Sequence, residues 1–542
     1  MTNLRIVWHI NLLLLLFLIT VPFSVVHQQD IPPASEWTQD AHDAQHTAYT
    51  YEEPLEPWTF LWAWNGPDEQ GGTGGHFYEV PPEARTVTGG NAIFVPAGTE
   101  GLYALAKADG QPIWHITNTS FKAAPAYDPT SKNLIVGGSD GRLYRINAES
   151  GTITSTYEAG SPLEKAVVLA DNFAYVVTNN GQLHKIDFLS MTRQWVYEGG
   201  ATVATPPAYS AKRGIVVYAT QDLFVHAVND ADGKEVWNVK PTPNQAGFPN
   251  QYDGQYPVIA EQHGIVFVRM RLDHNQGLWG GPGNSGMYPT SNGETRAFLV
   301  DNPDLQNLFA LDLDTGEKAF IPAVGYSGHE GYVNGEAFLD TGPLPVIYTS
   351  PDGKEVAYMA FRSGQGNPPD GRWDSHMGEM VLDNETIPDL AAGDLRFVKF
   401  ENSEIYITDE AESITLGGST IFATNWTAIF STTIINRNIN LGLNFENPID
   451  TERHPIIVRN QKACDDYDPQ THWTTCDLAL FGDTRTWPSP GWWVYWNVNA
   501  PYNPPDGYTG GVAPRFTYVS DGLIVVEGEA GDLFVLKHSG KS

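Results

Sequence analysis

The sequence predicts an all-β protein that forms a single toroidal β-propeller of eight four-stranded blades, with seven blades as the alternative. Two observations support this fold class. A unit of about forty residues recurs along the chain, which is typical of propeller blades. The 542 residues also include 53 Gly and 38 Pro, with 12% aromatic residues, and this composition favours many short strands joined by turns over long helices.

Four copies of the repeat occur in succession. They span Ile93–Trp114, Leu134–Ile153, Ala174–Trp195 and Val216–Trp237. Each copy contains an apolar strand, a tight turn, a strand of alternating character, a second turn and a closing strand. When the copies are aligned on the apolar residue that ends the second strand, the steps are 41, 40 and 42 residues, between Leu105, Ile146, Ile186 and Val228. A row of unrelated hairpins would not keep so regular a period.

A large aromatic ring recurs at one position of the repeat. Nine residues after the aligned position stand Trp114, Ser155, Trp195 and Trp237. A ring at a fixed place in successive blades suits the wedge between neighbouring sheets, where it buries on the order of 150 to 250 Å². We therefore predict a structural role for the three tryptophans, as residues that dock one blade on the next.

Further blades follow with less regular sequences. A fifth copy is split between Gly264–Met270 and Asn307–Phe320, with an insertion near residues 272–296. Later blades are expected at Glu355–Asp383, from Ser419 onward and at Leu523–Lys537, with a second insertion near 436–517. We assign residues 86–542 to the propeller. Residues 28–85 are expected to form an entry segment whose strand closes the ring, because an open ring would expose sheet edges.

The N-terminus carries an export signal. Residues 1–27 contain an uninterrupted apolar stretch behind Arg5, and this stretch fits either a cleaved signal peptide or a membrane anchor through residues 6–26. The two cysteines of the chain, Cys464 and Cys476, are 12 residues apart and would form a disulfide in an oxidising compartment. Both observations predict an extracytoplasmic protein, secreted or periplasmic.

The charge balance excludes one class of partner. Asp and Glu number 64 against 31 Lys and Arg, a formal charge of -33. Such a chain repels phosphate backbones and anionic lipid head groups, so we exclude nucleic acid. A membrane contact is expected only through the N-terminal segment.

The strings ALAKADGQPIW (Ala104–Trp114), AVNDADGKEVW (Ala227–Trp237) and ALDLDTGEKAF (Ala310–Phe320) resemble the tryptophan-docking motif of propellers of the pyrroloquinoline-quinone (PQQ) type. Residues Trp37–Thr50 resemble the entry segment of that family. The resemblance implies one of two functions. Some members are quinoprotein dehydrogenases with quinone and calcium at the propeller axis, and others are scaffolds that bind proteins, such as bacterial outer-membrane assembly propellers.

This chain is nearer to the scaffold members, because it has neither adjacent cysteines nor a C-x-x-C-H haem site. We expect a binding or interaction scaffold whose protein, small-molecule or glycan partner is unknown. The alternatives are a PQQ-dependent dehydrogenase that oxidises an alcohol or sugar, with PQQ and calcium as cofactors, and a carbohydrate-binding propeller.

Two loop regions hold the candidate ligand-binding residues. Gly-rich stretches between residues 325 and 383 carry polar side chains near blade edges, and an exposed tryptophan in the first insertion could stack on a sugar. The candidates are His329, Glu330, Arg372, Asp374, His376, Glu379 and Trp279. For the polar residues, plain ion pairing or solvent exposure is the competing interpretation. The sequence identifies no catalytic residue and no metal ligand.

Overall fold

The computed structural model describes seventeen stretches of the chain. These are residues 36–55, 59–64, 84–252, 254–273, 291–325, 330–333, 336–339, 342–350, 353–362, 375–386, 389–397, 406–408, 411–425, 429–436, 450–453, 514–528 and 533–538. The predicted signal segment and the predicted disulfide between Cys464 and Cys476 lie outside them. Within the described stretches, no helix has the length and apolar character needed to cross a bilayer.

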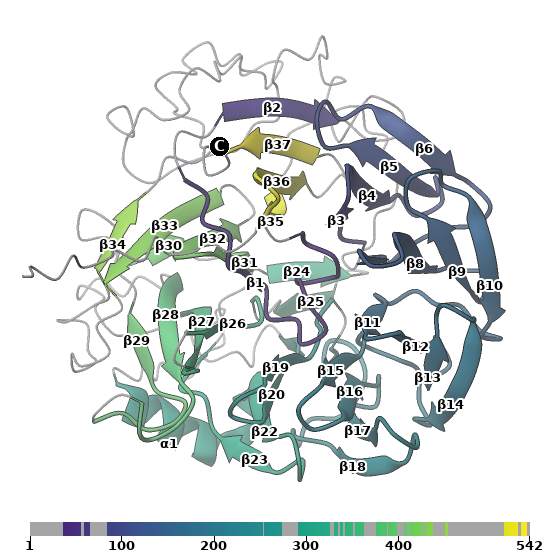
Figure 1. Ribbon diagram of the computed structural model, residues 1–542. Helices are drawn as coiled ribbons and strands as arrows, with labels where there is room; N and C mark the ends of the chain where they lie inside the picture. Colours follow the sequence, from purple (N-terminus) through teal and green to yellow (C-terminus); the bar gives the residue numbers. More distant parts are fainter. Residues whose placement is uncertain are drawn as a thin grey trace, which may run out of the picture. The chain divides into compact units, whose positions relative to one another are not determined.

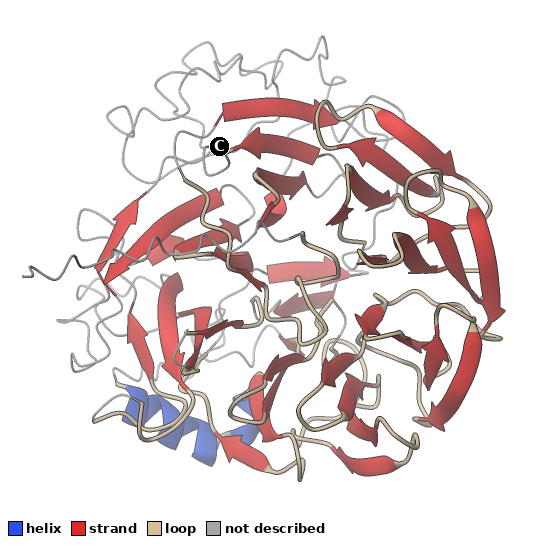
Figure 2. Cartoon of the chain, in the orientation of Figure 1, coloured by secondary structure: helices blue, strands red, loops and turns tan. Residues whose placement is uncertain are grey.

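The described residues between 36 and 538 form a ring of eight blades whose own strands pair antiparallel (Figures 1 and 2), so the predicted all-β propeller with eight blades is confirmed. Blades 1 to 4 each contain four consecutive strands, and the first strand of each blade lies on the inner side of the ring. Blade 1 has β3 (Val87–Gly89), β4 (Ala92–Pro96), β5 (Leu102–Ala106) and β6 (Pro112–Ile116), and blade 2 has β7 (Ala126–Asp128), β8 (Asn133–Gly137), β9 (Arg142–Asn147) and β10 (Ile153–Glu158). Blade 3 has β11 (Val168–Ala170), β12 (Phe173–Val177), β13 (Gln182–Asp187) and β14 (Thr192–Glu198), and blade 4 has β15 (Ala208–Ser210), β16 (Ile215–Ala219), β17 (Val225–Asn229) and β18 (Glu235–Val239).

Blades 5 to 7 contain the less regular copies. Blade 5 has β19 (Val258–Ala260), β20 (Ile265–Arg269), β22 (Leu308–Asp312) and β23 (Lys318–Phe320). Blade 6 has β26 (Val346–Thr349), β27 (Glu355–Arg362), β28 (Ser375–Val381) and β29 (Leu395–Phe397), with β30 (Tyr406–Thr408) also paired to β28. Blade 7 has β31 (Ala411–Gly417), β32 (Thr420–Asn425), β33 (Ile429–Asn436) and β34 (Asp450–Arg453). Strand β34 falls inside the range that the sequence assigned to the second insertion, so part of that range belongs to a blade.

The first insertion and the segment that follows blade 5 add a small three-stranded sheet and two short helices to the ring. Strand β21 (Leu272–Asp273) pairs with β25 (Glu336–Leu339), which pairs with β24 (Glu330–Val333). Helix α1 (Asn292–Asp301) begins at Ser291, whose side chain accepts a hydrogen bond from the Glu294 amide, and the 3-10 helix η2 (Pro303–Leu305) follows. The Asn292 side chain exchanges two hydrogen bonds with the Leu395 backbone, so α1 covers the outer edge strand of blade 6.

The N-terminal segment closes the ring at blade 8. This blade contains β35 (Pro514–Ser520), β36 (Leu523–Gly528) and β37 (Leu533–Lys537), and its outermost strand is β2 (Thr59–Trp64), which pairs antiparallel with β37. Strand β1 (Tyr49–Thr50) pairs in parallel with β31 of blade 7. The last blade therefore combines the N-terminal strand β2 with three C-terminal strands, and β1 adds the N-terminal segment to blade 7 as well.

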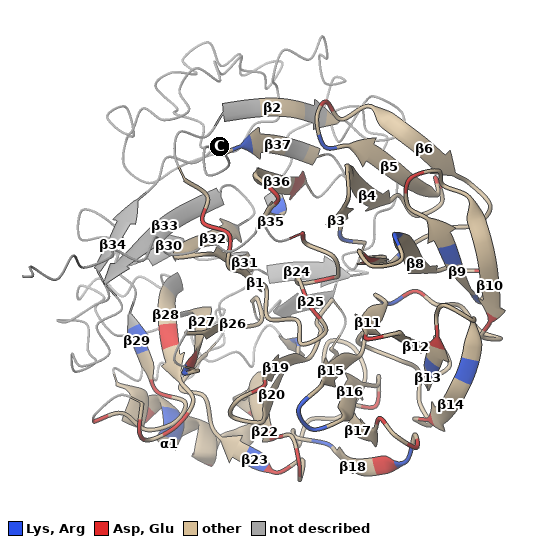
Figure 3. Ribbon diagram, in the orientation of Figure 1, with Lys and Arg blue, Asp and Glu red and all other residues tan. Residues whose placement is uncertain are grey.

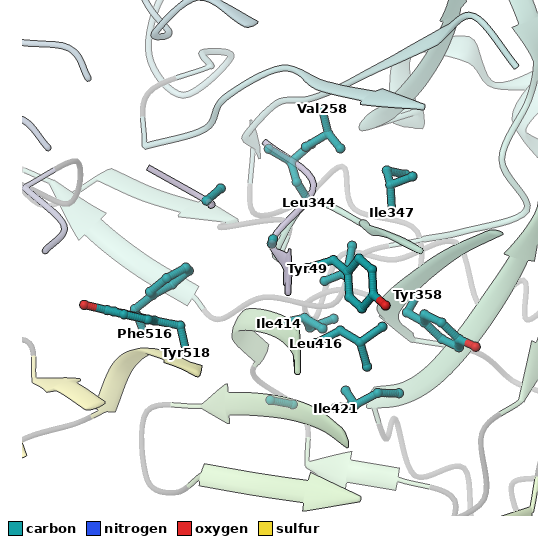
Figure 4. Close-up of a cluster of buried hydrophobic side chains, with 14 of the residues drawn as sticks. Tyr49, Val258, Leu344, Ile347, Tyr358, Ile414, Leu416, Ile421, Phe516 and Tyr518 are labelled. Carbon is teal, nitrogen blue, oxygen red and sulfur yellow. The ribbon is translucent and has the colours of Figure 1, made fainter. Parts of the chain in front are cut away.

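Apolar side chains fill the spaces between blades. The second strands β4, β16 and β20 are buried along their whole length, whereas the outer strand β10 alternates between half-buried and exposed residues. Figure 4 shows part of the cluster formed by blades 5 to 8 and the entry segment, with Tyr49 of β1 beside Leu416 and with Phe516 beside Tyr518. Burial on both faces of each blade accounts for the apolar runs that marked the repeats.

Candidate functional site: the axial hub

Residues 37–50, which we call the hub, contact the inner strand of every blade. In seven blades a backbone N–H of the inner strand donates a hydrogen bond to the hub. The donor and acceptor pairs are Thr88 to Trp37 O, Tyr127 to Thr38 O, Leu169 to Gln39 Oε1, Tyr209 to Ala44 O, Ile259 to Gln45 O, Ile347 to Thr47 O and Leu416 to Ala48 O, at 2.6 to 3.0 Å. Blade 8 is reached through Ser520, whose Oγ accepts a hydrogen bond from the Trp37 amide at 3.0 Å. The hub thus follows the order of the blades around the centre of the ring (Figure 1).

The hub backbone adopts an unusual conformation. Four of its residues have positive φ although none is glycine, namely Ala41 (47°), His42 (83°), His46 (57°) and Ala48 (52°). A left-handed conformation costs an L-residue about 1 to 2 kcal/mol. Such residues persist only where the surrounding structure fixes them, and here the hydrogen bonds to the blades provide that constraint.

An ion pair is buried beside the hub. Arg85 Nη1 lies 3.0 Å from Asp40 Oδ1 and 3.2 Å from Oδ2, and the guanidinium carbon lies 4.9 Å from the centre of the Tyr256 ring and 5.0 Å from that of Phe516. Burial alone would lower the pKa of Arg85, but Asp40, Tyr256 and Glu527 together outweigh it and raise the pKa. The guanidinium is therefore charged, and its charge is compensated by Asp40 and by two aromatic faces.

A second buried carboxylate lies in blade 8. Glu527 Oε1 accepts hydrogen bonds from Thr86 N at 2.8 Å and from Thr86 Oγ1 at 2.5 Å, and Thr86 Oγ1 lies 2.7 Å from the hydroxyl of Tyr518. Burial raises the pKa of Glu527, while Arg515 and the bonds from Thr86 oppose the rise. Trp37 stacks on Tyr518 with ring centres 4.8 Å apart. The carboxylates of Asp40 and Glu527 are thus both bonded by side chains or amides of the chain itself.

Two acidic side chains hold residues 51–55, the segment that follows the hub. Glu52 accepts hydrogen bonds from the amides of Asp521 and Gly522 in blade 8, and its Oε1 lies 2.9 Å from His538 Nε2. Glu53 accepts hydrogen bonds from the Ser419 amide at 2.5 Å and, in the same turn of blade 7, from Thr420 Oγ1 at 2.7 Å. The sequence analysis did not single out this pair, because its partners are more than 360 positions away in the chain.

The predicted ligand-binding residues do not form one site within the described residues. His329, Arg372, Asp374 and Trp279 lie outside them. Of the others, Glu330 begins β24 in the three-stranded sheet, whereas His376 and Glu379 lie on β28 of blade 6.

The structure places Glu379 in the core of blade 6 and not in a ligand site. Its side chain is 2% exposed, and its carboxylate lies 2.8 Å from Arg396 Nη2 and accepts a hydrogen bond from the Tyr358 hydroxyl at 2.8 Å. Glu379 stands directly opposite Arg396 in the register of β28 and β29. This ion pair leaves the carboxylate a structural role.

The repeat tryptophans lie between neighbouring blades. The indole N–H of each donates a hydrogen bond to a carbonyl of the next blade: Trp114 to Ala148 at 2.9 Å, Trp195 to Asp230 at 2.8 Å and Trp237 to Leu313 at 2.9 Å. Sequence reasoning missed a fourth member, Trp62 of β2, which donates to Lys107 O at 2.9 Å across the junction of blades 8 and 1. The sequence signal that could have identified Trp62 was the presence of a tryptophan in the segment expected to close the ring.

No group of three or more His, Cys, Asp or Glu side chains is placed to hold a metal ion in the stretches of chain that the structure describes. The hydrogen bonds of the hub join the inner strands of the eight blades, and Asp40 and Arg85 compensate each other's charge.

Comparison with known proteins identifies the repeats. Residues 98–321, which include strands β5 to β23, match a family model described as outer membrane protein assembly factor BamB. Two proteins named outer membrane protein assembly factor BamB are each 24% identical to this chain. The one from Nitrosomonas eutropha aligns over 286 residues, 51% of this chain and 58% of the relative, and the one from Shewanella oneidensis over 181 residues, 31% and 43%. The chain thus matches about half the length of these relatives.

Among solved structures, a quinohemoprotein alcohol dehydrogenase from Pseudomonas putida superimposes with a TM-score of 0.49 and 11% identity, over 94% of this chain and 81% of that one. The match of residues 98–321 to the family model agrees with the resemblance that the docking motifs predicted.

Proposed function

We propose that this chain is a non-catalytic scaffold that binds a protein partner outside the cytoplasm. The observation that carries the proposal is the match of residues 98–321 to the model of an outer-membrane assembly factor. The geometry of the axial region supports it. Asp40 is paired with Arg85, and Glu527 with Thr86, so these carboxylates serve the cohesion of the ring.

The extracytoplasmic location rests on the sequence. The apolar segment of residues 6–26 serves as a signal peptide or an anchor, and Cys464 and Cys476 form a disulfide after export. By analogy with the named relatives, the partner is a component of outer-membrane protein assembly.

The outer rim offers contact points for such a partner. Exposed apolar side chains occur at Ile113 of β6, at Leu189 and at Val236 of β18, each 41% to 45% exposed. Lys and Arg residues alternate with Asp and Glu residues along the described part of the ribbon (Figure 3). A mixed rim with single apolar residues suits a protein interface of the transient class.

The proposal is tested by isolating the tagged full chain from its own cells and identifying proteins that remain bound in fixed stoichiometry. We expect one envelope protein to co-purify, and we expect Ile113→Asp together with Val236→Asp to reduce its recovery while the melting temperature stays unchanged. Lys234→Asp, at an exposed position beside Val236, serves as the control for added negative charge.

A chain that purifies alone and reduces a dye in the presence of PQQ, calcium and an alcohol or sugar would instead be the dehydrogenase. Glycan binding that depends on Trp279 would establish the carbohydrate-binding alternative.

A further inference from the structure

His263 links blade 5 to blade 6 through two carboxylates. It lies in the turn between β19 and β20, with Nδ1 3.0 Å from Glu355 Oε2 and Nε2 2.9 Å from Asp383 Oδ2. Glu355 begins β27, and Asp383 follows β28. The exposed fractions are 18% for the His263 side chain, 2% for Glu355 and 29% for Asp383. The contact is therefore a largely buried bridge between two blades.

The geometry requires a protonated ring. A carboxylate accepts hydrogen bonds and donates none, so each ring nitrogen must carry a proton to bond its partner. The hydrogen bond from Glu355 raises the pKa of His263 most, burial opposes the rise, and Asp383 adds to it. Burial alone would raise the pKa of Asp383, but hydrogen bonds from Thr386 and His263 bring it well below its usual value, so this carboxylate stays charged.

The bridge also organises the backbone on both sides. Glu355 Oε2 accepts hydrogen bonds from the amides of Gln262 and His263 at 2.9 and 3.0 Å. In blade 6, Asp383 Oδ1 accepts from the amides of Glu385 and Thr386 at 2.7 and 2.5 Å. Two turns on neighbouring blades are thus held by the same three side chains.

Other charged groups near this turn have partners of their own. Arg213 of blade 4 packs against Gly264, and its Nε lies 3.4 Å from Asp314 Oδ2 of blade 5. Glu261, in the same turn as His263, accepts a hydrogen bond from the Lys212 amide at 2.5 Å. Among the described residues, Glu355 and Asp383 are therefore the charged groups that determine the protonation of His263.

We propose that His263, Glu355 and Asp383 form a proton-dependent clasp, which fastens the 382–386 turn of blade 6 to blade 5 in mildly acidic surroundings and releases it as the pH rises. When the His263 ring loses one proton, one ring nitrogen presents a lone pair to a carboxylate. One of the two hydrogen bonds to Glu355 and Asp383 is then lost. Because folding raises the pKa of His263, its stabilising effect is complete below the ordinary histidine pKa of about 6.5 and is lost as the pH rises through the folded-state value.

Hydrogen exchange of the full chain between pH 5.5 and 8.5, corrected for the intrinsic rate, measures this release. We expect the amides of Gln262, His263 and residues 383–386 to open several-fold more often at the alkaline end, because the bonds that hold the two turns together are then lost. His263→Gln should exchange fast at every pH. His263→Lys should stay protected at every pH, because it keeps the charge. His115→Gln, at a histidine that bonds the Glu100 carbonyl in blade 1, is the control and should behave like the wild type.

A wild-type profile in which these amides show no pH step would overturn the clasp, and so would the same step in the wild type and in His263→Gln. The wild-type profile decides the question even if the glutamine variant fails to fold. Because the measurement needs no partner, its outcome is independent of the scaffold function.

Discussion

The contact between blades 1 and 2 and the contact between blades 2 and 3 follow the same plan with different residues. In the first, Trp114 lies against the turn of the next blade and bonds Ala148 O. In the second, Ser155 stands at the tryptophan position, and Nη1 of Arg145, the residue opposite it across the strand pair, donates to Phe188 O at 3.3 Å. Ala148 and Phe188 both lie two residues after the aligned position of their repeats, so their carbonyls are equivalent. In the second contact an arginine therefore replaces the indole as the donor to this carbonyl.

The turn residue changes together with the aromatic ring. Gly151 has φ 70°, and a Cβ placed there would lie 2.7 Å from Cγ of Trp114. The equivalent residue of blade 3 is Met191, which has φ 52° and a side chain. Because a non-glycine residue occupies the same left-handed turn where the tryptophan is missing, we infer that the docked ring, more than the turn conformation, requires glycine.

The second contact is also more polar. The Tyr157 hydroxyl lies 3.0 Å from His184 Nδ1 between blades 2 and 3, whereas Ile116 and Tyr144 belong to the apolar cluster between blades 1 and 2. The two contacts should therefore respond differently to mutation and to pH.

The largest effect is expected from exchanging the turn residues. Gly151→Met should lower the free energy of unfolding by about 3 kcal/mol, because the new side chain displaces Trp114. Met191→Gly, its matched counterpart, should cost about 1 to 2 kcal/mol, because it removes a buried side chain but relieves a positive φ. Denaturant unfolding of both variants measures the difference, and a gain in stability for Met191→Gly would show that the turn itself demands glycine.

Acid should weaken the second contact and spare the first. Burial lowers the pKa of His184 to about 4, so the folded protein resists a protonation that the unfolded chain undergoes near pH 6.5. The stabilisation from neutral His184 is present above pH 6.5 and is lost as the pH falls toward 4, by up to about 2 to 3 kcal/mol.

Unfolding midpoints between pH 7 and 4.5 should therefore fall more steeply for the wild type than for His184→Gln, which keeps a partner for Tyr157. His115→Gln controls for removal of a histidine elsewhere. Parallel slopes for the wild type and His184→Gln would contradict the assignment.

A designed docking pair sharpens the comparison further. Ser155→Trp alone should be neutral or destabilising, because the Met191 side chain occupies the place of the ring. Ser155→Trp combined with Met191→Gly should recover about 1 to 2 kcal/mol relative to the sum of the single changes. The coupling energy from the four unfolding curves measures the effect, and a value near zero would mean that ring and glycine act independently.

The smallest effect concerns the substitute donor. Arg145→Ala should cost about 1 kcal/mol through loss of the bonds that Nη1 donates to Phe188 O and to Leu189 O. Arg142→Ala, on the same strand but paired with the exposed Glu158, should cost at most a few tenths. Indistinguishable losses would indicate that Arg145 is not the replacement for the indole.

The sequence could predict the ring but not its centre. The repeat period defined the blades, because each blade buries the same apolar positions at a fixed spacing. The route of residues 37–50 could not be predicted, since this segment has no repeat and its acceptors meet strands up to about 370 positions away. Strand β34 was hidden because its sequence, DTER, contains no apolar residue.

The candidate site shows the same limit at one residue. A Gly-rich region with many polar side chains suggested that Glu379 binds a ligand. Its partner Arg396 is 17 positions further on, and only the register of β28 and β29 brings the two charges together. Local composition cannot distinguish a charge that awaits a ligand from one that is already paired.

The central claim is that this propeller is a scaffold and not a quinone enzyme. Its most direct test is a titration of the chain from Gln28 onward with PQQ, with and without calcium, followed by absorbance, melting temperature and dye reduction with alcohols and sugars. The scaffold account predicts no change in melting temperature under either metal condition and no dye reduction. Calcium-dependent stabilisation accompanied by dye reduction would contradict it and make the protein a dehydrogenase.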